Sequence, residues 1–409
     1  MRSLNLSKAV IVGCVFLLGT GCIFAKDWPQ WRGPNRDGEV SGFSAPAKWP
    51  TALKQNWKTT VGSGDATPAL VGDKLYVFAR QGAEEVTLCL QAADGKEIWR
   101  DKYEAQAVTG APSRHPGPRS SPAVADGKVV TLGVGGVVSC IDAGSGKMLW
   151  RKDPYPQVVP RFFTSCSPVI VGGKAVVQVG TAGNGAIIAF NLADGSEKWK
   201  WAEEGPEYAS PVVVTVDGVE QVVALTEKSI VGIAAADGKL LWKLPFAPAD
   251  RAYNAATPIV DGQTVIFTGA GRGAKAVKIE KQGDGFTAKE LWSNPDLAPQ
   301  YNTPVLKDGL LFGFSDKGNL YCINAADGKT AWTDTAQYGR GFAAIVGAGS
   351  ALLALPSTSE LIVFKPDGKA YSEIAKYKVA EKATYAYPVV SDNHIFVRDE
   401  DSVAMWTIE

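Results

Sequence analysis

Short apolar runs separated by turn residues recur along this chain at intervals of roughly 40 to 50 residues. Five segments share one frame, in which an apolar strand meets an Asp-Gly or Ser-Gly turn and a Trp follows the turn Gly by four residues. These segments are 89–99, 140–150, 189–199, 232–242 and 322–332. Such turns supply the positive φ values that a tight hairpin needs, so each segment predicts strand, turn and strand.

A second series of dipeptides opens runs of β-branched residues upstream of these frames. It consists of Thr67-Pro68, Ser121-Pro122, Ser167-Pro168, Ser210-Pro211, Thr257-Pro258, Thr303-Pro304 and Tyr387-Pro388. Pro at a strand start removes only a hydrogen bond that the sheet does not need there. Most of these runs then meet another turn, as at Asp126-Gly127 and Asp308-Gly309, so each unit is predicted to contain four short strands.

The spacing of the prolines gives the number of units. Successive gaps are 54, 46, 43, 47 and 46 residues, and the gap from Pro304 to Pro388 is 84 residues, or two units. Ala344 takes the missing position, since Gly349 follows it by five residues just as Gly309 follows Pro304. The sequence therefore predicts an all-β, eight-bladed β-propeller of four-stranded antiparallel blades.

The eighth unit is short, because only two or three strands fit between Pro388 and Glu409. The segment 55–61 looks like an outermost strand that carries the repeated Trp, Trp57, but lacks its preceding hairpin. We therefore predict that this N-terminal strand pairs with the C-terminal strands and closes the ring, which leaves no long open edge between the first and last units.

The repeated frame with its terminal Trp resembles the tryptophan-docking motif of the pyrroloquinoline-quinone-like, or quinoprotein-type, repeat propellers, over roughly residues 55–409. Within this family the chain most resembles exported, non-catalytic members, such as the lipoprotein that assists outer-membrane barrel assembly. The resemblance implies that the repeated Trp docks between blades, at Trp57, Trp99, Trp150, Trp199, Trp242 and Trp332. Trp292 is a weaker copy and the seventh unit has no Trp, so docking is expected to be incomplete in the fifth and seventh blades.

Residues 1–25 predict a secretory signal peptide, with Arg2, Lys8, no acidic residue and an apolar run over 9–19. We expect cleavage after Ala25 and a periplasmic protein. The stretch 19–22 loosely resembles a lipoprotein box, so a lipid on Cys22 and association with the outer membrane stay open as an alternative.

The net charge argues against nucleic acid as a partner, and the hydropathy argues against a membrane-spanning segment. Removing residues 1–25 leaves 40 Lys plus Arg against 42 Asp plus Glu, and such a near-neutral chain is not expected to bind nucleic acid. No later segment approaches 18 uninterrupted apolar residues, so no transmembrane span is expected. We expect a monomer.

The segment 26–54 leads into the propeller and carries Trp28 and Trp31 in an otherwise polar, turn-rich stretch. It resembles the leader that precedes many secreted bacterial propellers of this type. We expect this leader to dock onto the propeller surface, with partner binding as the alternative.

Several residues of the types that form disulfides, metal sites or catalytic sites are expected to have ordinary structural roles. Four cysteines lie outside the signal peptide, and we expect structural thiols at Cys89, Cys140, Cys166 and Cys322. The two histidines, His115 and His394, are too scattered for a zinc site and are expected to be ordinary loop and turn residues. The acid pairs 84–85 and 203–204 are expected in exposed turns, and neither a catalytic constellation nor a metal site is predicted.

One constellation remains, formed by the residues that enter each inner strand at one mouth of the channel. It contains Arg119, Arg161, Tyr208, Arg251, Tyr253, Asn254, Tyr301, Asn302, Arg340 and Tyr385. Converging Arg and aromatic side chains suit a carboxylate-bearing or planar ligand, through bidentate hydrogen bonds and stacking. The alternative is that these residues only plug the channel and cap strand ends.

Two functions follow. The first is a non-enzymatic binding or protein-interaction scaffold in the bacterial cell envelope, with an envelope protein or a small anionic ligand as partner and no cofactor. The second is a quinone-dependent dehydrogenase, in which the mouth would hold pyrroloquinoline quinone and a calcium ion. The sequence has no Cys-Cys pair and no clear calcium-binding set, so the scaffold is favoured.

Overall fold

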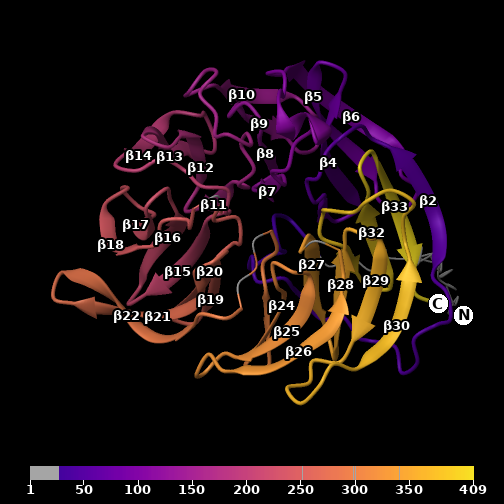
Figure 1. Ribbon diagram of the computed structural model, residues 1–409. Helices are drawn as coiled ribbons and strands as arrows, with labels where there is room; N and C mark the ends of the chain where they lie inside the picture. Colours follow the sequence, from indigo (N-terminus) through magenta and orange to yellow (C-terminus); the bar gives the residue numbers. More distant parts are fainter. Residues whose placement is uncertain (1–26, 251, 298, 300, 340) are drawn as a thin grey trace, which may run out of the picture.

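The computed structural model describes residues 27–409 apart from 251, 298, 300 and 340, and its strands form eight sheets arranged in a ring (Figure 1). Seven sheets have four strands and one has five. The first strand of each blade lies nearest the centre of the ring and the last strand lies on its outside (Figure 1). The predicted eight-bladed propeller is therefore confirmed.

The first four blades follow the chain without interruption. Blade 1 consists of β3 (Ala69–Val71), β4 (Lys74–Gln81), β5 (Glu84–Gln91) and β6 (Glu97–Glu104). A 3-10 turn, η1 (Ala111–Arg114), precedes blade 2, which consists of β7 (Ala123–Ala125), β8 (Lys128–Leu132), β9 (Val138–Asp142) and β10 (Met148–Lys152). Blade 3 consists of β11 (Val169–Val171), β12 (Lys174–Thr181), β13 (Asn184–Asn191) and β14 (Glu197–Trp201). Blade 4 consists of β15 (Val212–Val216), β16 (Val219–Leu225), β17 (Ser229–Ala234) and β18 (Leu240–Pro245).

The remaining blades include two strands from the N-terminal part of the chain. Blade 5 consists of β19 (Ile259–Asp261), β20 (Thr264–Gly269), β21 (Gly273–Gln282) and β22 (Gly285–Asn294). Blade 6 consists of β23 (Val305–Lys307), β24 (Leu310–Phe314), β25 (Asn319–Asn324) and β26 (Thr330–Gln337). Blade 7 consists of β27 (Ala343–Ala348), β28 (Ala351–Pro356), β29 (Glu360–Phe364) and β30 (Glu373–Lys378), with β1 (Glu39–Val40) added. Blade 8 consists of β31 (Val389–Ser391), β32 (His394–Arg398), β33 (Ser402–Thr407) and β2 (Lys54–Thr60).

The ring closes as predicted, through the pairing of β2 with β33. The two strands are antiparallel, from Lys54 opposite Thr407 to Thr60 opposite Ser402. In Figure 1 the indigo β2 lies beside the yellow β33. Blade 8 thus takes its outer strand from the start of the propeller and its other strands from the end.

The apolar core lies mainly between blades. One cluster joins Val130 of blade 2 to Val177 of blade 3, and another joins Phe312 of blade 6 to Leu352 of blade 7. Each face of a blade is therefore buried against its neighbour, which explains the runs of β-branched and aromatic residues in the middle strands.

The repeated Trp docks onto the next blade in a uniform way. Its indole N–H donates to a backbone carbonyl of the next blade in six pairs: Trp57 to Ala92, Trp99 to Ala143, Trp150 to Leu192, Trp199 to Ala235, Trp292 to Ala325 and Trp332 to Asp367. The turn Gly of the next blade lies against the ring, so that a Cβ at Gly95 would come 2.6 Å from Trp57. The Gly in the frame therefore provides both a positive φ and room for the docked Trp.

Two details differ from expectation. The expected gap at Trp292 was wrong, because its indole N–H donates to the carbonyl of Ala325 at 2.7 Å. Trp242 differs instead: its indole N–H donates to Oε1 of Gln221 in its own blade, at 2.7 Å. In blade 5 the strands β21 and β22 are each 10 residues long and their turn lies at residues 283–284, so the turn that receives the docked Trp in other blades is absent from that junction.

Trp242 also explains why its frame contains Gly232. In the other frames the residue opposite the Trp is Cys or Ala, whereas a Cβ on Gly232 would come 2.0 Å from Nε1 of Trp242. We expect Gly232→Cys to lower the free energy of unfolding by about 1–3 kcal/mol, because the indole must give up its bond to Gln221. The matched change Ala189→Cys, opposite Trp199, should cost less than about 1 kcal/mol. Equal urea midpoints for the two variants would contradict this account.

The residue before each proline has a role that the sequence did not reveal. Its backbone N–H donates to a Ser or Thr hydroxyl at the same position of the next blade, in five links: Thr67 to Ser121, Ser121 to Ser167, Ser167 to Ser210, Thr257 to Thr303 and Tyr387 to Thr67. The last link joins blade 8 to blade 1. These buried bonds tie the inner strands together where the chain enters each blade.

The first part of the leader, residues 28–40, lies against the inner strands of the ring. Trp28 exchanges two backbone hydrogen bonds with Leu70, on the innermost strand of blade 1, at 2.8 and 2.9 Å. The carbonyl of Pro29 accepts from the N–H of Val124 in blade 2 at 2.8 Å. Farther along, β1 pairs in parallel with β27, the innermost strand of blade 7. The leader therefore enters the channel, turns, and leaves along blade 7.

Arg32 holds the turn of this leader in place and is fully buried. Its guanidinium donates only to uncharged oxygens: the carbonyls of Arg36, Asp37, Thr303 and Pro304 and the hydroxyl of Tyr387, at 2.7–3.2 Å. All five N–H groups that a guanidinium possesses are thereby satisfied. Arg36 makes similar bonds to the carbonyls of Ser167 and Pro168 in blade 3.

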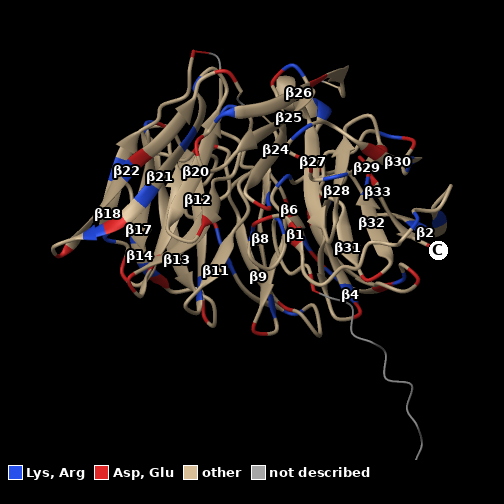
Figure 2. Cartoon of the chain, turned by 90° about the horizontal axis from the view of Figure 1, so that it is seen from below, with Lys and Arg blue, Asp and Glu red and all other residues tan. Residues whose placement is uncertain are grey.

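Charged residues of both signs are mixed at the strand ends and hairpin turns, without a face of one sign in the view of Figure 2. This distribution agrees with the near-neutral composition. Among the residues that the structure describes, no helix is long and apolar enough to span a membrane.

Candidate functional site

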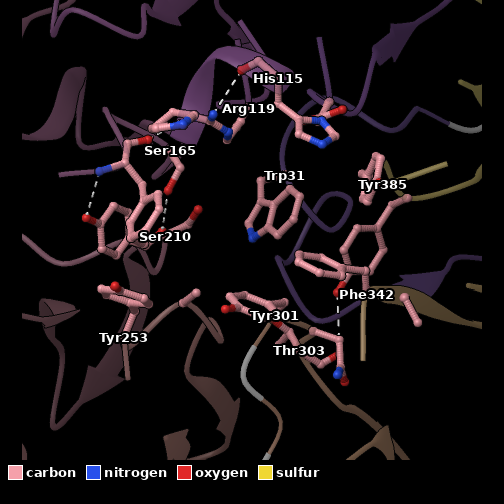
Figure 3. Close-up of a pocket in the computed structure, with 18 of the residues that line it drawn as sticks. Trp31, His115, Arg119, Ser165, Ser210, Tyr253, Tyr301, Thr303, Phe342 and Tyr385 are labelled. Carbon is pink, nitrogen blue, oxygen red and sulfur yellow. Dashed lines mark hydrogen bonds and ion pairs between the residues drawn. The ribbon is translucent and has the colours of Figure 1, made fainter. Parts of the chain in front are cut away.

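A cavity of about 400 Å³ opens at the channel mouth, where the chain enters the inner strands. Trp31 of the leader lies at its centre, and side chains from the other labelled residues surround it (Figure 3). The volume is in the range of small-molecule sites, about 300–1,000 Å³. The leader therefore closes the channel beneath the cavity and contributes to its lining.

Seven of the 19 lining residues come from one position of the repeat, three residues before the proline that opens a blade. This position contributes Asp65, Arg119, Ser165, Tyr208, Ala255, Tyr301 and Tyr385. Four of these seven were predicted from the sequence, whereas Asp65, Ser165 and Ala255 were missed although the same offset would have found them. Phe162 and Phe342 also line the cavity but lie at other offsets, so the repeat does not reveal them.

Aromatic side chains line much of the cavity, and we call the following set the aromatic cup: Trp31, His115, Phe162, Tyr208, Tyr253, Tyr301, Phe342 and Tyr385. Neighbouring rings meet mostly edge to face, as in the pair Tyr208 and Tyr253 with centroids 5.5 Å apart. Tyr301 and Phe342 instead stack in parallel at 4.3 Å. Such contacts stabilise the rings beyond the burial of their area and hold the cup in shape.

The charged groups of the cup gather on one wall. Nδ1 of His115 lies 3.1 Å from Oδ2 of Asp65. Arg119 donates to the carbonyls of Phe162 and His115, at 2.8 and 2.9 Å. Burial lowers the pKa of Arg119, an effect that the nearby Asp65 carboxylate opposes. His115 is thus half-buried and bonded to Asp65, and differs from the ordinary loop histidine that the sequence predicts.

The two histidines should titrate in opposite directions. The hydrogen bond to Asp65 raises the pKa of His115, and burial lowers the pKa of His394, relative to an ordinary value of about 6.5. The stabilisation from the His115–Asp65 pair is therefore full below about pH 6.5 and is lost as pH rises through the raised pKa. NMR titration of the two imidazoles measures both values.

The variant Asp65→Asn provides the control for this titration. It should return the pKa of His115 toward the ordinary value and leave that of His394 unchanged, because His394 lies on β32, away from the cup. Coincident titration of both histidines in the unaltered protein would contradict the pairing.

Two predicted rim residues, Asn254 and Asn302, are buried, and their side-chain amides donate hydrogen bonds to backbone carbonyls. Nδ2 of Asn254 donates to the carbonyl of Phe246 at 2.9 Å. Nδ2 of Asn302 donates to the carbonyls of Phe314 and Gly341, at 2.8 and 3.0 Å. These bonds fix the loops that enter blades 5 and 6, and only Asn302 also lines the cavity.

The remaining predicted rim residues fall in three groups. Tyr208, Tyr253, Tyr301, Tyr385 and Arg119 line the cavity. Arg161 does not line it and is exposed beside the ring of Phe162. Arg251 and Arg340 lie outside the described residues.

Two carboxylates that were expected in exposed turns are buried, so that expectation was wrong. Glu85 is 1% exposed, and its Oε1 accepts from the N–H of Val134 in the next blade at 2.9 Å. Glu204 is 4% exposed, pairs with Lys243 and accepts from the hydroxyl of Thr226. Both carboxylates connect strands and lie outside the cup.

The described residues do not fit a calcium-dependent quinone. Calcium takes six to eight oxygen ligands, including carboxylates. Asp65 is the only carboxylate among the described lining residues, and it is already paired with His115. Within the described part of the chain, no three or more His, Cys, Asp or Glu residues group as metal ligands.

The four described cysteines are free and buried, as expected: Cys89, Cys140, Cys166 and Cys322. Burial raises the pKa of each thiol to about 12. Protonated, inaccessible thiols do not act as nucleophiles, so these cysteines serve packing.

Comparison with protein families and relatives gives one consistent result. The family model described as outer membrane protein assembly factor BamB matches residues 36–177 and 82–334. The outer membrane protein assembly factor BamB of Burkholderia pseudomallei (strain K96243) is 24% identical over 366 residues, which covers 85% of this chain and 86% of that protein. The quinohemoprotein alcohol dehydrogenase ADH-IIG of Pseudomonas putida is 29% identical, but over 34% of this chain and 19% of that enzyme.

Solved structures agree on the fold. BamB from Moraxella catarrhalis has a TM-score of 0.65 at 15% identity, with 88% of this chain and 98% of that chain covered. Quinohemoprotein alcohol dehydrogenase from Comamonas testosteroni has a TM-score of 0.71 at 13% identity, with 94% of this chain and 80% of that chain covered. At these identities the likeness shows the shared propeller and no particular activity.

Proposed function

This chain belongs to the family of the outer membrane protein assembly factor BamB, and on that basis we propose that it is a protein-interaction scaffold of the cell envelope. In this role it binds an envelope protein during outer-membrane protein assembly, works without a cofactor and catalyses no reaction. The observation that carries the proposal is the family match, which extends over residues 36–334. The lack of a calcium ligand set among the described cup residues supports it.

We infer that the partner contacts the rim of the mouth, above the cup. Arg161 is exposed there, and the ring of Tyr301 is 39% exposed. Exposed Arg and Tyr side chains are enriched at the energetic centres of protein interfaces. Arg119, Tyr208, Tyr253 and Tyr385 support this surface from the wall below, and the outward side of the rim is where a large partner would meet the propeller.

A photo-crosslinking amino acid at position 161 tests this proposal in the native envelope. We expect a crosslink to an outer-membrane protein or to an assembly factor that inserts one. The control places the same group at Lys329, on an exposed outer turn whose side chain is 84% accessible, and should give no such product. Oxidation of alcohols by the purified protein with added quinone, calcium and dye would overturn the scaffold.

Export is part of the same proposal. We infer that residues 1–25 direct the chain to the periplasm and are removed after Ala25, and that the mature chain is a monomer. Mass spectrometry of the mature protein tests this directly, because it separates an N-terminus at Lys26 from a lipid-modified N-terminus at Cys22.

A further inference from the structure

Trp31 forms a fixed platform at the centre of the aromatic cup. Its indole N–H donates to the hydroxyl of Thr257 at 2.9 Å, and its ring meets Tyr387 edge to face at 4.8 Å. The ring is nevertheless only partly buried, because it lines the cavity. Its position is therefore set before any ligand arrives, which lowers the entropy cost of binding.

Hydroxyl groups surround this platform. In the described part of the chain, no hydrogen bond engages the hydroxyls of Tyr253, Tyr301 or Tyr385, although all three side chains line the cavity. Each phenol can both donate and accept a hydrogen bond. The cup thus offers an apolar face at its centre and polar groups at its edge.

The charges in the cup are already engaged by the protein. Asp65 is paired with His115, and Arg119 donates to two backbone carbonyls. A cationic ligand would meet Arg119, and an anionic ligand would meet Asp65. Because the two opposite charges lie on the same wall, a ligand of either sign would meet a like charge there, which is unfavourable. The described lining therefore favours a ligand without charge.

We propose that the aromatic cup binds an uncharged saccharide, with a sugar ring on Trp31 and its hydroxyls at the tyrosine edge. A pyranose combines one apolar C–H face with a rim of hydroxyls, and this combination matches the apolar platform and the polar edge of the cup. The volume of about 400 Å³ accommodates a small ligand of this kind. This site lies below the protein contact proposed for the rim, and Tyr301 takes part in both.

Calorimetric titration of the mature protein with cellobiose, maltose and N,N′-diacetylchitobiose tests the proposal. We expect saturable binding of at least one disaccharide and quenching of tryptophan fluorescence. Trp31→Ala and Tyr301→Ala should each weaken that binding by about tenfold or more, as loss of an aromatic platform does. Tyr301→Ala keeps the test valid if Trp31→Ala fails to fold, because Tyr301 is already 39% exposed.

Tyr155→Ala is the matched control, because Tyr155 is also half-buried but packs beside Lys200 outside the cup. It should leave saccharide affinity unchanged. The proposal is overturned if no disaccharide binds, if the cup variants bind normally, or if N-acetyltyrosinamide or benzoate binds in preference. Trp31→Phe should leave crosslinking from position 161 intact, so failure of the saccharide site and failure of the scaffold are distinguishable.

Discussion

Replacing Arg32 with methionine should lower the free energy of unfolding by about 3–5 kcal/mol, measured as a lower urea midpoint. Methionine fills part of the space but donates no hydrogen bond. Five oxygens, from the leader and from blades 6 and 8, would then lose the Arg32 donor at once, and the carbonyl of Thr303 would keep only the hydroxyl of Tyr387 at 3.3 Å. The leader would also lose the group that joins it to the inner strands of those blades.

The matched control for this variant is Arg161→Met, which makes the same chemical change on an exposed side chain. It should alter stability by no more than about 0.5 kcal/mol. Arg32→Lys should recover only part of the loss, because an ammonium has three donors and lacks the planar fork. An unchanged midpoint for Arg32→Met would show that the leader contributes nothing to the stability of the ring.

Replacing Trp57 with alanine should cost about 3 kcal/mol and open the ring at its closure. Trp57 packs against Phe396 in blade 8, with centroids 6.0 Å apart, and donates to Ala92 of blade 1 at 3.0 Å. It therefore joins the only two blades that lie at opposite ends of the propeller sequence. We expect limited proteolysis of this variant to cut first near β2, where wild-type protein resists.

Trp332→Ala provides the comparison, because Trp332 makes the same kind of bond, to Asp367 at 2.7 Å, between consecutive blades 6 and 7. Its urea midpoint should fall by a similar amount, since both rings are half-buried. Its proteolysis should not begin at the N-terminal strand. Identical cleavage patterns for the two variants would mean that the closure has no special weakness.

The repeating part of the molecule could be predicted from sequence because each blade packs against its neighbour with similar residues at equivalent positions. The turn Gly, the docked Trp and the proline recur at fixed offsets, and the offsets alone give eight blades and place Trp57 on the outer strand of the last blade. Even the Trp242 exception has a local cause, the long hairpin of the next blade.

The leader could not be predicted in the same way, because it does not repeat. The position of Arg32 depends on carbonyls near residues 303 and 304, far away in sequence. Nothing local in the leader indicates which oxygens will meet it. For the same reason Trp31 was not recognised as part of the cup, and Asp65 was missed although it occupies the same repeat position as Tyr208.

The pairing of β2 with β33 has a consequence for the order of folding. The hydroxyl of Thr407 donates to the side chain of Asn56 across 351 residues of sequence, so this contact cannot form until almost the whole chain has been synthesised. The leader is part of the same closed arrangement, since its Trp28 and Arg32 are almost completely buried in the finished ring. Contacts between residues so far apart in sequence form slowly, because closing the loop costs conformational entropy before the contacts contribute any stability. Earlier blades can form first, but the finished ring is a late event.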